Sequence, residues 1–290
     1  MRTKLKRLLF IAPFMTLVSI FLIFPALFGF FYSFTNYDPR SNISMRYVGF
    51  SNYAAVVSDE EFKVAARNML VFVPLTVLFE MILGLIIAYL LRNPFRGRSI
   101  VRVALLIPWL ISPVANGLMW RFLFNQRFGL LNFWLILFGL PRASDPRNPG
   151  FAFPTVMAIE IWRRVPLVSF LILPGILAIP PVYWAIAELE GLSHFARIRM
   201  IILPRLWRLL LTIMLLMIGD MLGTFEGTLL LFPGGPRLES VTIGFYSYWN
   251  AFKIFNLTFG MTSAWLIAAA VLFVGFWYLI LIRDKTAKYR

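Results

Sequence analysis

The sequence predicts an all-α membrane protein with about six transmembrane helices. Of its 290 residues, 60% are hydrophobic and 17% are aromatic, and the mean hydropathy is +0.79. This composition is too apolar for a soluble protein of this length. Several apolar runs reach the roughly 20 residues that a helix needs to cross about 30 Å of hydrocarbon. Basic residues gather in short segments between these runs, which is typical of membrane proteins.

The placement of the basic residues predicts the topology. The formal net charge is +15, and sixteen of the 28 lysines and arginines lie in four short segments, at residues 1–8, 92–102, 197–208 and 283–290. Ten others are spread through longer loops on the opposite side. Because short cytoplasmic segments carry the excess of Lys and Arg, both termini should be cytoplasmic. The charge therefore reflects topology in a lipid bilayer, and we expect no nucleic-acid partner.

Six apolar segments are expected to cross the membrane, at residues 8–34, 69–91, 103–124, 151–178, 206–231 and 259–282. A cleaved signal peptide is the alternative for the first segment, but no small-residue cleavage site follows its long apolar run. Gly84 and Ala88 are spaced for close helix packing in the second segment. Pro108 and Pro113 should kink the third.

The loops between these segments are short, so we expect a single domain. No Gly/Ser-rich linker and no internal repeat divides residues 1–290, and the predicted core covers about residues 66–285. The loop at 125–150 contains an apolar patch, residues 130–140, which we expect to form a short surface helix. Asp59, Glu60 and Glu61 form an acidic cluster that we interpret as a solvated face.

The segment at residues 180–204 is far less apolar than its two neighbours and should form a helical elbow. Pro180 and Pro181 suit a helix start, because proline needs no amide donor there. The first short helix should end at Gly191, where a backbone bend costs little. A second short helix is expected to run to Pro204, at the beginning of the next span. A polar elbow between two spans suggests a docking surface and not a catalytic loop.

The elbow resembles the cytoplasmic loop signature of permease subunits of binding-protein-dependent ABC importers. That signature reads E-A-A, three residues, G, nine residues, I-x-L-P, and Gly191, Ile201, Leu203 and Pro204 match its spacing. The opening triplet departs from it as Ala185-Ile186-Ala187, and Glu190 replaces the usual Asp before the glycine. The missing first glutamate puts one polar contact with the ATPase in doubt.

Further stretches are similar to the carbohydrate branch of these permeases, which includes maltose-like and glycerol-phosphate-like systems. They are Val48 to Tyr53, Ile107-Pro108, Leu123 to Asn132, Trp162 to Pro166 and Pro233 to Pro236. The resemblance implies a type I importer permease fold with cytoplasmic coupling helices in the cell membrane of a prokaryote. The implied solute is a sugar, an oligosaccharide or a related polyol or sugar phosphate.

The resemblance also implies partners and a set of contact residues. It implies a heterodimer with a second permease subunit, two ATPase subunits that hold ATP and Mg, and an external solute-binding protein. The residues expected to couple to the ATPase are Tyr183, Trp184, Ala185, Ala187, Glu188, Glu190, Gly191, Leu203 and Pro204.

The chain itself carries no recognisable catalytic or metal-binding motif. It has no G-x-x-x-x-G-K-[ST] loop to hold phosphates. His194 is the only histidine and has no nearby metal-ligand partners, and the absence of cysteine excludes thiol catalysis and disulfides. We therefore expect a non-catalytic subunit without a cofactor of its own.

Ionisable residues inside the predicted spans are the candidates for a solute pathway, because charge at membrane depth is costly. They are Glu80, Glu160, Arg163, Arg164, Asp220 and Glu226. Glu160 and Arg164 are spaced i,i+4 and could pair on one helix face. The family's solute contacts would map to Trp109, Asn116, Glu160, Arg163, Arg164 and Asp220.

Two interpretations of these residues remain open. They either line a solute cavity or form salt bridges that only fix packing. If they bind solute, carboxylates and an indole suit a hydroxyl-rich sugar, whereas two arginines suit an anionic one. The alternatives to a permease subunit are a secondary transporter subunit or a membrane enzyme that acts on lipid or polymer.

Overall fold

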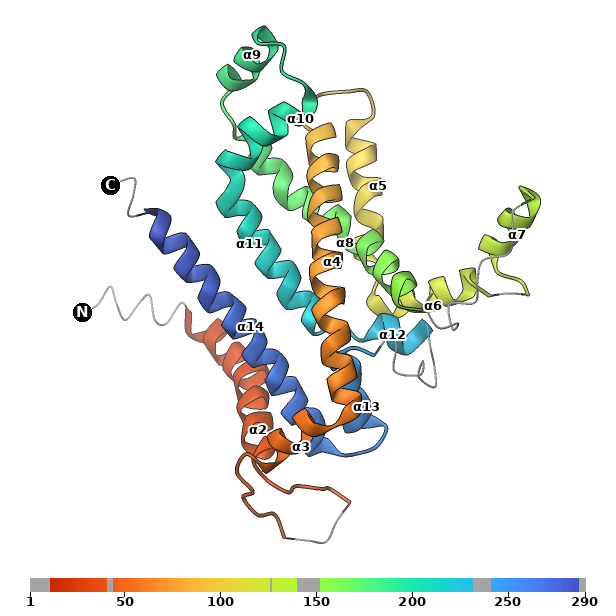
Figure 1. The fold of residues 1–290 in the computed structure, drawn as a ribbon, viewed down its shortest axis with the longest axis vertical. Helices are drawn as coiled ribbons and strands as arrows, with labels where there is room; N and C mark the ends of the chain where they lie inside the picture. The colour runs from red at the N-terminus through yellow and green to blue at the C-terminus, as the bar shows by residue number, and fades with distance from the viewer. Residues whose placement is uncertain (1–10, 41–43, 126, 140–151, 232–240, 287–290) are drawn as a thin grey trace. The chain divides into compact units, whose positions relative to one another are not determined.

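The computed structural model describes residues 11–40, 44–125, 127–139, 152–231 and 241–286 (Figure 1). In these residues the regular structure is helical, and the β-bridge between Thr35 and Tyr47 is isolated. The all-α prediction is therefore confirmed. The chain forms two compact units, residues 1–63 with 246–269 and residues 64–245 with 270–290. The assignment of the whole chain to one domain stays a prediction.

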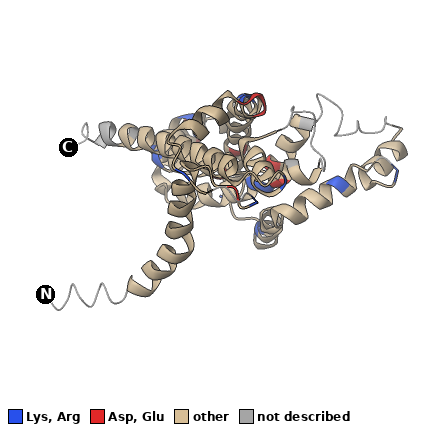
Figure 2. Ribbon diagram, turned by 90° about the horizontal axis from the view of Figure 1, so that it is seen from below, with Lys and Arg blue, Asp and Glu red and all other residues tan. Residues whose placement is uncertain are grey.

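The number of spans agrees with the sequence. Four described helical segments are long and apolar enough to cross a membrane, namely Ile11–Ser33, Glu60–Leu90, His194–Leu222 and Leu257–Ile280. Two bent pairs pass the same test, Arg98–Leu110 with Pro113–Leu123 and Phe153–Leu177 with Pro181–Leu189. The described residues thus hold up to six spans, and charged residues are sparse along their ribbons (Figure 2).

The first unit holds the first span and the segments that close its end. Its helices are η1 (Ser19–Ile23), α2 (Phe24–Ser33), α3 (Ser51–Ser58), most of α13 (Ile243–Phe252) and the first part of α14 (Leu257–Thr286). The Asn52 side-chain amide donates to the carbonyls of Ser33, at 2.8 Å, and Thr35, at 2.7 Å. Because the last carbonyls of a helix lack intrahelical donors, Asn52 caps the end of this span.

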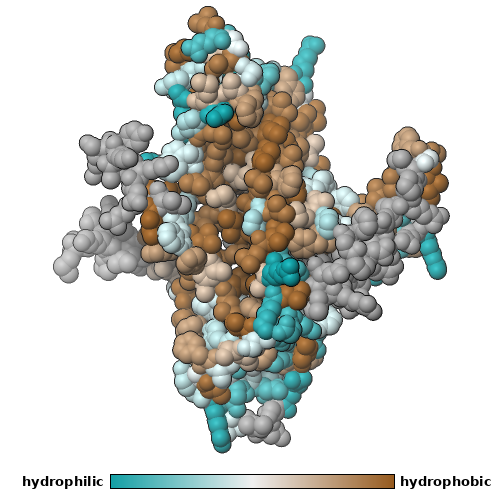
Figure 3. Space-filling model, viewed as in Figure 1, coloured by the Kyte–Doolittle hydropathy of each residue, from teal (hydrophilic) through white to brown (hydrophobic). Residues whose placement is uncertain are grey.

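The second unit holds the remaining helices. They are α4 (Glu60–Leu90, from residue 64), α5 (Arg98–Leu110), α6 (Pro113–Leu123), α7 (Leu130–Leu137), α8 (Ala152–Leu177), α9 (Pro181–Leu189), α10 (His194–Arg197), η2 (Ile198–Ile202), α11 (Leu203–Leu222) and α12 (Glu226–Leu231). The surface over α4 is hydrophobic along most of its length (Figure 3), as expected for a span. The predicted surface helix at 130–140 is confirmed as α7.

Helices α4 and α8 approach each other closely in the core of the second unit. A Cβ added to Gly84 would lie 2.5 Å from Val168 Cγ1, so only glycine fits at this position. Ala88, one turn further along α4, is fully buried. The prediction that Gly84 and Ala88 serve close packing is confirmed. The buried core around this contact includes Phe72 and Ile172.

Helix α4 begins nine residues before the predicted span. Asp59 Oδ1 accepts hydrogen bonds from the backbone N–H groups of Glu61, at 2.7 Å, and Phe62, at 3.2 Å. Glu60 and Glu61 occupy the first turn, where negative charge is favourable. The acidic cluster therefore caps and starts the helix, a role that hydropathy alone does not detect.

Two predicted spans are not continuous. The third is broken and not only kinked, because α5 ends at Leu110 and α6 begins at Pro113, with a bend of 92°. Ser112 caps α6 by accepting from the Ala115 N–H at 3.2 Å. The fifth helix ends at Leu222, and residues 226–231 form the separate helix α12. The predicted turn at Pro233 to Pro236 lies outside the described residues.

Candidate functional site

The elbow helix α9 ends in a turn that requires glycine. Gly191 has a φ of 63°, in the left-handed region. Its N–H donates to the Glu188 carbonyl at 3.1 Å, and the Leu192 N–H donates to the Ala187 carbonyl at 2.9 Å. These two bonds form a Schellman motif, the common glycine-dependent helix end. The predicted bend at Gly191 is confirmed.

The second helix of the elbow does not end at Pro204. One helical segment runs from His194 to Leu222, and Leu203 and Pro204 lie in the first turn of α11. The preceding residues, 198–202, form a π-helical turn. A proline cannot donate to the carbonyl four residues earlier, and a wider turn accommodates it without ending the helix. The second helix of the elbow is therefore continuous with the fifth span.

Aromatic rings and arginines fasten α9 to the neighbouring helices. The Arg92 guanidinium carbon lies 3.8 Å from the Trp184 ring centroid and 4.4 Å from that of Tyr89, at the end of α4. Arg205 lies 3.5 Å from the Tyr183 ring centroid. Such cation–π contacts are attractive. We call Arg92, Tyr89 and Trp184 the elbow clamp.

Two further features support the elbow clamp. The Tyr89 hydroxyl is hydrogen-bonded to His194 Nδ1 at 2.9 Å. Burial lowers the pKa of the Arg92 guanidinium from its ordinary value, whereas neighbouring Tyr89 and Glu188 act in the opposite direction. Arginine starts from so high a pKa that the group stays protonated and keeps its attraction to both rings. His194 is thus a hydrogen-bonding residue of the elbow.

The outward side of α9 is apolar. Ala187 is only 1% exposed and Trp184 is half-buried, so both belong to the inner side. Val182, Ile186 and Leu189 are exposed and lie at i, i+4 and i+7, on one helix face. We call these three residues the outer stripe. Of the other coupling candidates, Tyr183, Ala185, Glu188, Glu190 and Gly191 are exposed on the elbow, as are Leu203 and Pro204 at its end.

A network of charged residues lies inside the second unit, between α8 and α11. Arg164 donates to Glu160 one turn earlier, to Asp220 Oδ2 at 2.7 Å and to Thr224 Oγ1 at 2.7 Å. Arg163 donates to Glu160 Oε2 through two nitrogens, each at 3.2 Å. The predicted pairing of Glu160 and Arg164 is confirmed. Both of their side chains are almost completely buried.

The network is closed on one side and open on another. A Cβ added to Gly227 would lie 3.0 Å from Glu160 Oε1, so α12 packs directly over this carboxylate. Asp220 is different, because 60% of its side chain is exposed. It lies two residues before the end of α11 and not deep within the span. Asp220 is therefore the most exposed member of the network.

Several buried polar groups near α4 and α6 have no hydrogen-bond partner among the described residues. Glu80 is fully buried, and neither of its carboxylate oxygens is bonded. Thr76, one turn earlier on α4, is equally buried and unpaired. Asn116 Oδ1 on α6 is also unpaired. Trp109 lies on α5, is 39% exposed and does not belong to the hydrogen-bonded network.

The chain matches one family over most of its length. Residues 80–283 match the family described as the binding-protein-dependent transport system inner membrane component. The chain belongs to this family. The resemblance derived from the elbow signature is thereby confirmed, and the chain is a multi-pass permease subunit of an ABC importer.

Named relatives agree with this assignment. The permease is 31% identical over 269 residues to the trehalose/maltose transport system permease protein MalF of Thermococcus litoralis, across 92% of this chain and 90% of the relative. It is 27% identical to the sulfoquinovosyl glycerol permease protein SmoG of Agrobacterium fabrum, across 97% and 92%. The sn-glycerol-3-phosphate permease protein UgpA of the same organism is also 27% identical, across 94% and 92%.

The fold of the permease is that of a solved transporter. A chain of the bacterial alginate ABC transporter, crystallised with an alginate pentasaccharide-bound periplasmic protein, superposes with a TM-score of 0.83. The sequences are 21% identical, and the match covers 98% of the permease and 97% of that chain. At this identity the likeness shows the fold alone.

Sequence reasoning missed Thr224 and the elbow clamp of the permease. Thr224 lies just beyond the end of α11, four residues after Asp220, and its hydroxyl donates to the Asp220 carbonyl at 3.2 Å. This i,i+4 spacing of polar residues is the signal that could have revealed it. From the sequence, Arg92 is one of several basic loop residues, although Tyr89 lies three positions earlier. No local pattern connects either of them to Trp184.

Proposed function

We propose that this permease carries a neutral, hydroxyl-rich solute of the sugar class and forms one half of its translocation pathway. The related permease proteins have names that refer to trehalose and maltose, to sulfoquinovosyl glycerol and to glycerol 3-phosphate. Both neutral and anionic solutes occur in this group. The charges inside the second unit support the neutral class.

The pairing of the two arginines is the observation that carries this choice. Arg163 and Arg164 both donate to Glu160, and Arg164 also donates to Asp220. An anionic solute would need a guanidinium that is free to form a bidentate pair, and these two are already paired. The exposed Asp220 carboxylate can instead accept hydrogen bonds from hydroxyl groups.

Transport by the complete complex in vesicles tests this proposal. Trehalose and maltose serve as neutral probes and glycerol 3-phosphate as the anionic probe, each supplied with the binding protein. We expect a disaccharide to be transported, and Asp220→Asn to raise its KM at least several-fold, because a charged acceptor binds hydroxyls more strongly than an amide does. Asp38→Asn, at an exposed carboxylate in the first unit, is the matched control. Transport of glycerol 3-phosphate alone would contradict the neutral assignment.

We propose that α9 docks on one of two ATPase subunits, to which we assign the binding of ATP and Mg. The exposed apolar outer stripe supports this role, because a helix with apolar residues at i, i+4 and i+7 suits a groove on a partner. Ala185 stands where the family signature has its first glutamate, so apolar contact should carry most of the binding. A second permease subunit and an external solute-binding protein complete the proposed complex.

The docking role requires the elbow to be cytoplasmic. The basic segments support cytoplasmic termini and a cytoplasmic Gly191, with Asn52, Asp145 and Gly235 outside. Positions 145 and 235 lie outside the described residues. Since the chain has no cysteine, single cysteines can replace the exposed Glu190 and Arg46. In intact cells an impermeant thiol reagent should label position 46 and not position 190. The reverse pattern would invert the topology.

A further inference from the structure

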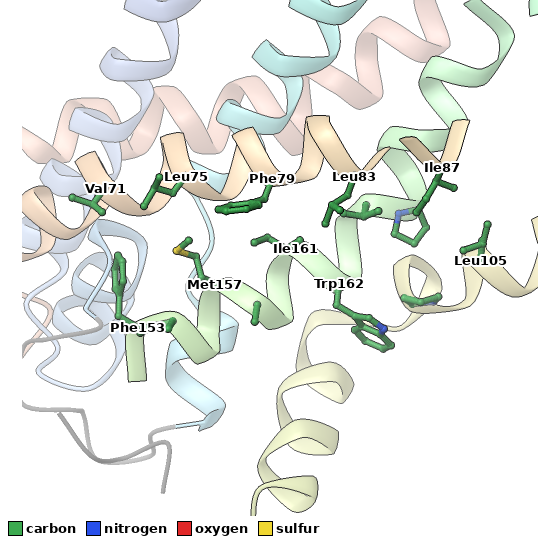
Figure 4. Close-up of a pocket in the computed structure, with 15 residues that line it drawn as sticks. Val71, Leu75, Phe79, Leu83, Ile87, Leu105, Phe153, Met157, Ile161 and Trp162 are labelled. Atoms are coloured by element: carbon green, nitrogen blue, oxygen red, sulfur yellow. The ribbon is translucent and has the colours of Figure 1, made fainter. Parts of the chain in front are cut away.

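A long apolar groove runs between three spans of the second unit (Figure 4). It is lined by α4, α5 and α8 and has a cavity volume of about 760 Å³. Leu83 and Ile87 line it from α4, Leu105 and Pro108 from α5, and Ile161 from α8. These side chains are apolar, and none of them can hold a solute through hydrogen bonds. The groove is therefore separate in character from the Glu160 network.

The position of the groove within the spans determines what can fill it. On α4 its lining runs from Val71 to Ile87, which is about 24 Å of helix at 1.5 Å per residue. The hydrocarbon core of a bilayer is about 30 Å thick, so most of the groove lies at the depth of acyl chains. The indole of Trp162 is the one lining side chain that could donate a hydrogen bond to water, so the walls hold water poorly at that depth.

One end of the groove leads to two arginines. Ile87 and Leu105 lie at the same end in Figure 4, next to the loop that joins α4 to α5. Leu105 follows Arg102 by three residues and Arg98 by seven, so the three side chains lie on one face of α5. The basic residues thus lie directly beyond the apolar lining.

Both guanidinium groups carry nitrogens that lack partners in the part of the chain that the structure describes. Nε and Nη2 of both Arg98 and Arg102 have no hydrogen-bond partner among the described residues, although both side chains are only partly exposed. Two guanidinium groups on one helix face present donors in the geometry that phosphate oxygens accept. Basic pockets between spans at the cytoplasmic surface bind anionic headgroups in other membrane proteins.

We propose that this groove and its two arginines bind an anionic phospholipid. The phosphate contacts Arg98 and Arg102, and one acyl chain lies in the groove between α4, α5 and α8. A phospholipid satisfies both regions at once, because its acyl chain covers the apolar walls and its phosphate pairs with the guanidinium groups. The site goes beyond solute transport and rests only on the chain spanning the membrane.

Lipid exchange on the intact complex tests the proposal. The complex is purified in neutral detergent, stripped of lipid and titrated with phosphatidylglycerol or phosphatidylcholine, and bound lipid is counted by native mass spectrometry. We expect one phosphatidylglycerol to bind more tightly than phosphatidylcholine. At about a fivefold loss for each basic residue near the surface, Arg98→Gln with Arg102→Gln should weaken that binding roughly thirtyfold.

Arg96→Gln is the matched control, because Arg96 lies in the same basic loop, is exposed and lies outside the α5 helix. It should change phosphatidylglycerol binding far less than the double variant does. An equal loss for Arg96→Gln would show only general attraction to a basic surface and would overturn the site. Equal binding of both lipids by the parent would overturn it as well.

A cross-linking experiment tests the acyl chain independently. Leu83→Cys introduces one thiol into the groove of this cysteine-free chain. It should react with a phosphatidylglycerol that carries a thiol-reactive group on its acyl chain. Cross-linking of position 83 to the second permease subunit instead would overturn the proposal, because that subunit would then occupy the groove. Neither readout depends on transport, so failure of the proposed solute class leaves the result interpretable.

Discussion

The elbow and the buried network both depend on an arginine, but they use it in different ways. Arg92 lies between two aromatic rings at the end of α4, and none of the bonds described for it involves a carboxylate. Arg164 is 3% exposed and holds two carboxylates and a hydroxyl by directed hydrogen bonds. Stacking on a ring tolerates sliding, whereas hydrogen bonds to fixed oxygens do not.

This difference matches the tasks that we propose for the two regions. An elbow that follows the movement of an ATPase needs a contact that survives small displacements. A charged residue inside a span needs every donor paired, because water is absent and an unpaired charge is costly. The cation–π contact of Arg92 in the elbow therefore tolerates small displacements, and we call it the tolerant contact. The hydrogen-bonded network of Arg164 inside the second unit does not, and we call it the strict contact.

The largest expected effect follows from removing the strict contact. Arg164→Gln leaves Glu160 and Asp220 without their common partner, and breaking a buried pair costs about 3–5 kcal/mol. We expect little folded protein after extraction from the membrane and a lower unfolding temperature for what remains. Size-exclusion chromatography and thermal unfolding in detergent measure both.

Arg163→Gln is the comparison for that experiment, because Arg163 contacts the same Glu160 but is less essential to it. Its side chain is 10% exposed, and Glu160 keeps its bond to Arg164 when Arg163 is replaced. The loss of stability should be clearly smaller. If the two variants were equally unstable, the central position of Arg164 in the network would be refuted.

A smaller effect is expected from removing the tolerant contact. Trp184→Ala deletes one of the two rings that hold Arg92, a loss of about 0.5–2 kcal/mol. The complex should assemble, but ATP hydrolysis should no longer respond to solute and binding protein. Trp184→Phe keeps a ring and should restore much of the response. The readout is the ratio of stimulated to basal ATPase activity in vesicles.

The mildest effect concerns an exposed pair. Hydrogen bonds from Arg40 lower the pKa of the Asp38 carboxyl from its ordinary value. A carboxyl with a lowered pKa stabilises the folded state above its ordinary pKa, and this contribution is lost as the pH falls through the lowered value. Asp38→Asn should therefore slightly lower the unfolding temperature near neutral pH and leave it unchanged in strong acid. Thermal unfolding at a series of acidic pH values measures the difference between parent and variant. A loss of stability as large as that of Arg164→Gln would contradict the contrast between an exposed pair and a buried network.

The sequence predicted those features that depend on local spacing. Six apolar runs, a glycine at a helix end and carboxylate–arginine pairing at i,i+4 can each be recognised within a few residues. The structure confirms all three, at the spans, at Gly191 and at Glu160 with Arg164.

The remaining features depend on contacts between distant residues. Asp220 and Thr224 lie 56 and 60 positions after Arg164, so no local periodicity predicts their hydrogen bonds with it. Arg92 and Trp184 are likewise joined only by the fold. Hydropathy also cannot show where a helix breaks, because α5 and α6 are equally apolar on both sides of the bend at residues 111–112.

The Asn52 cap at the end of the first span has a consequence for the order of synthesis. Asn52 reaches Ser33 and Thr35 within 20 residues of chain, so this contact can close soon after the first span leaves the ribosome. Trp265, whose ring lies 4.7 Å from that of Phe30, is made about 235 residues later. At about 5–20 residues per second, that interval is roughly 12–47 seconds. The first helix can therefore be capped by Asn52 and inserted in the bilayer before Trp265 has been synthesised.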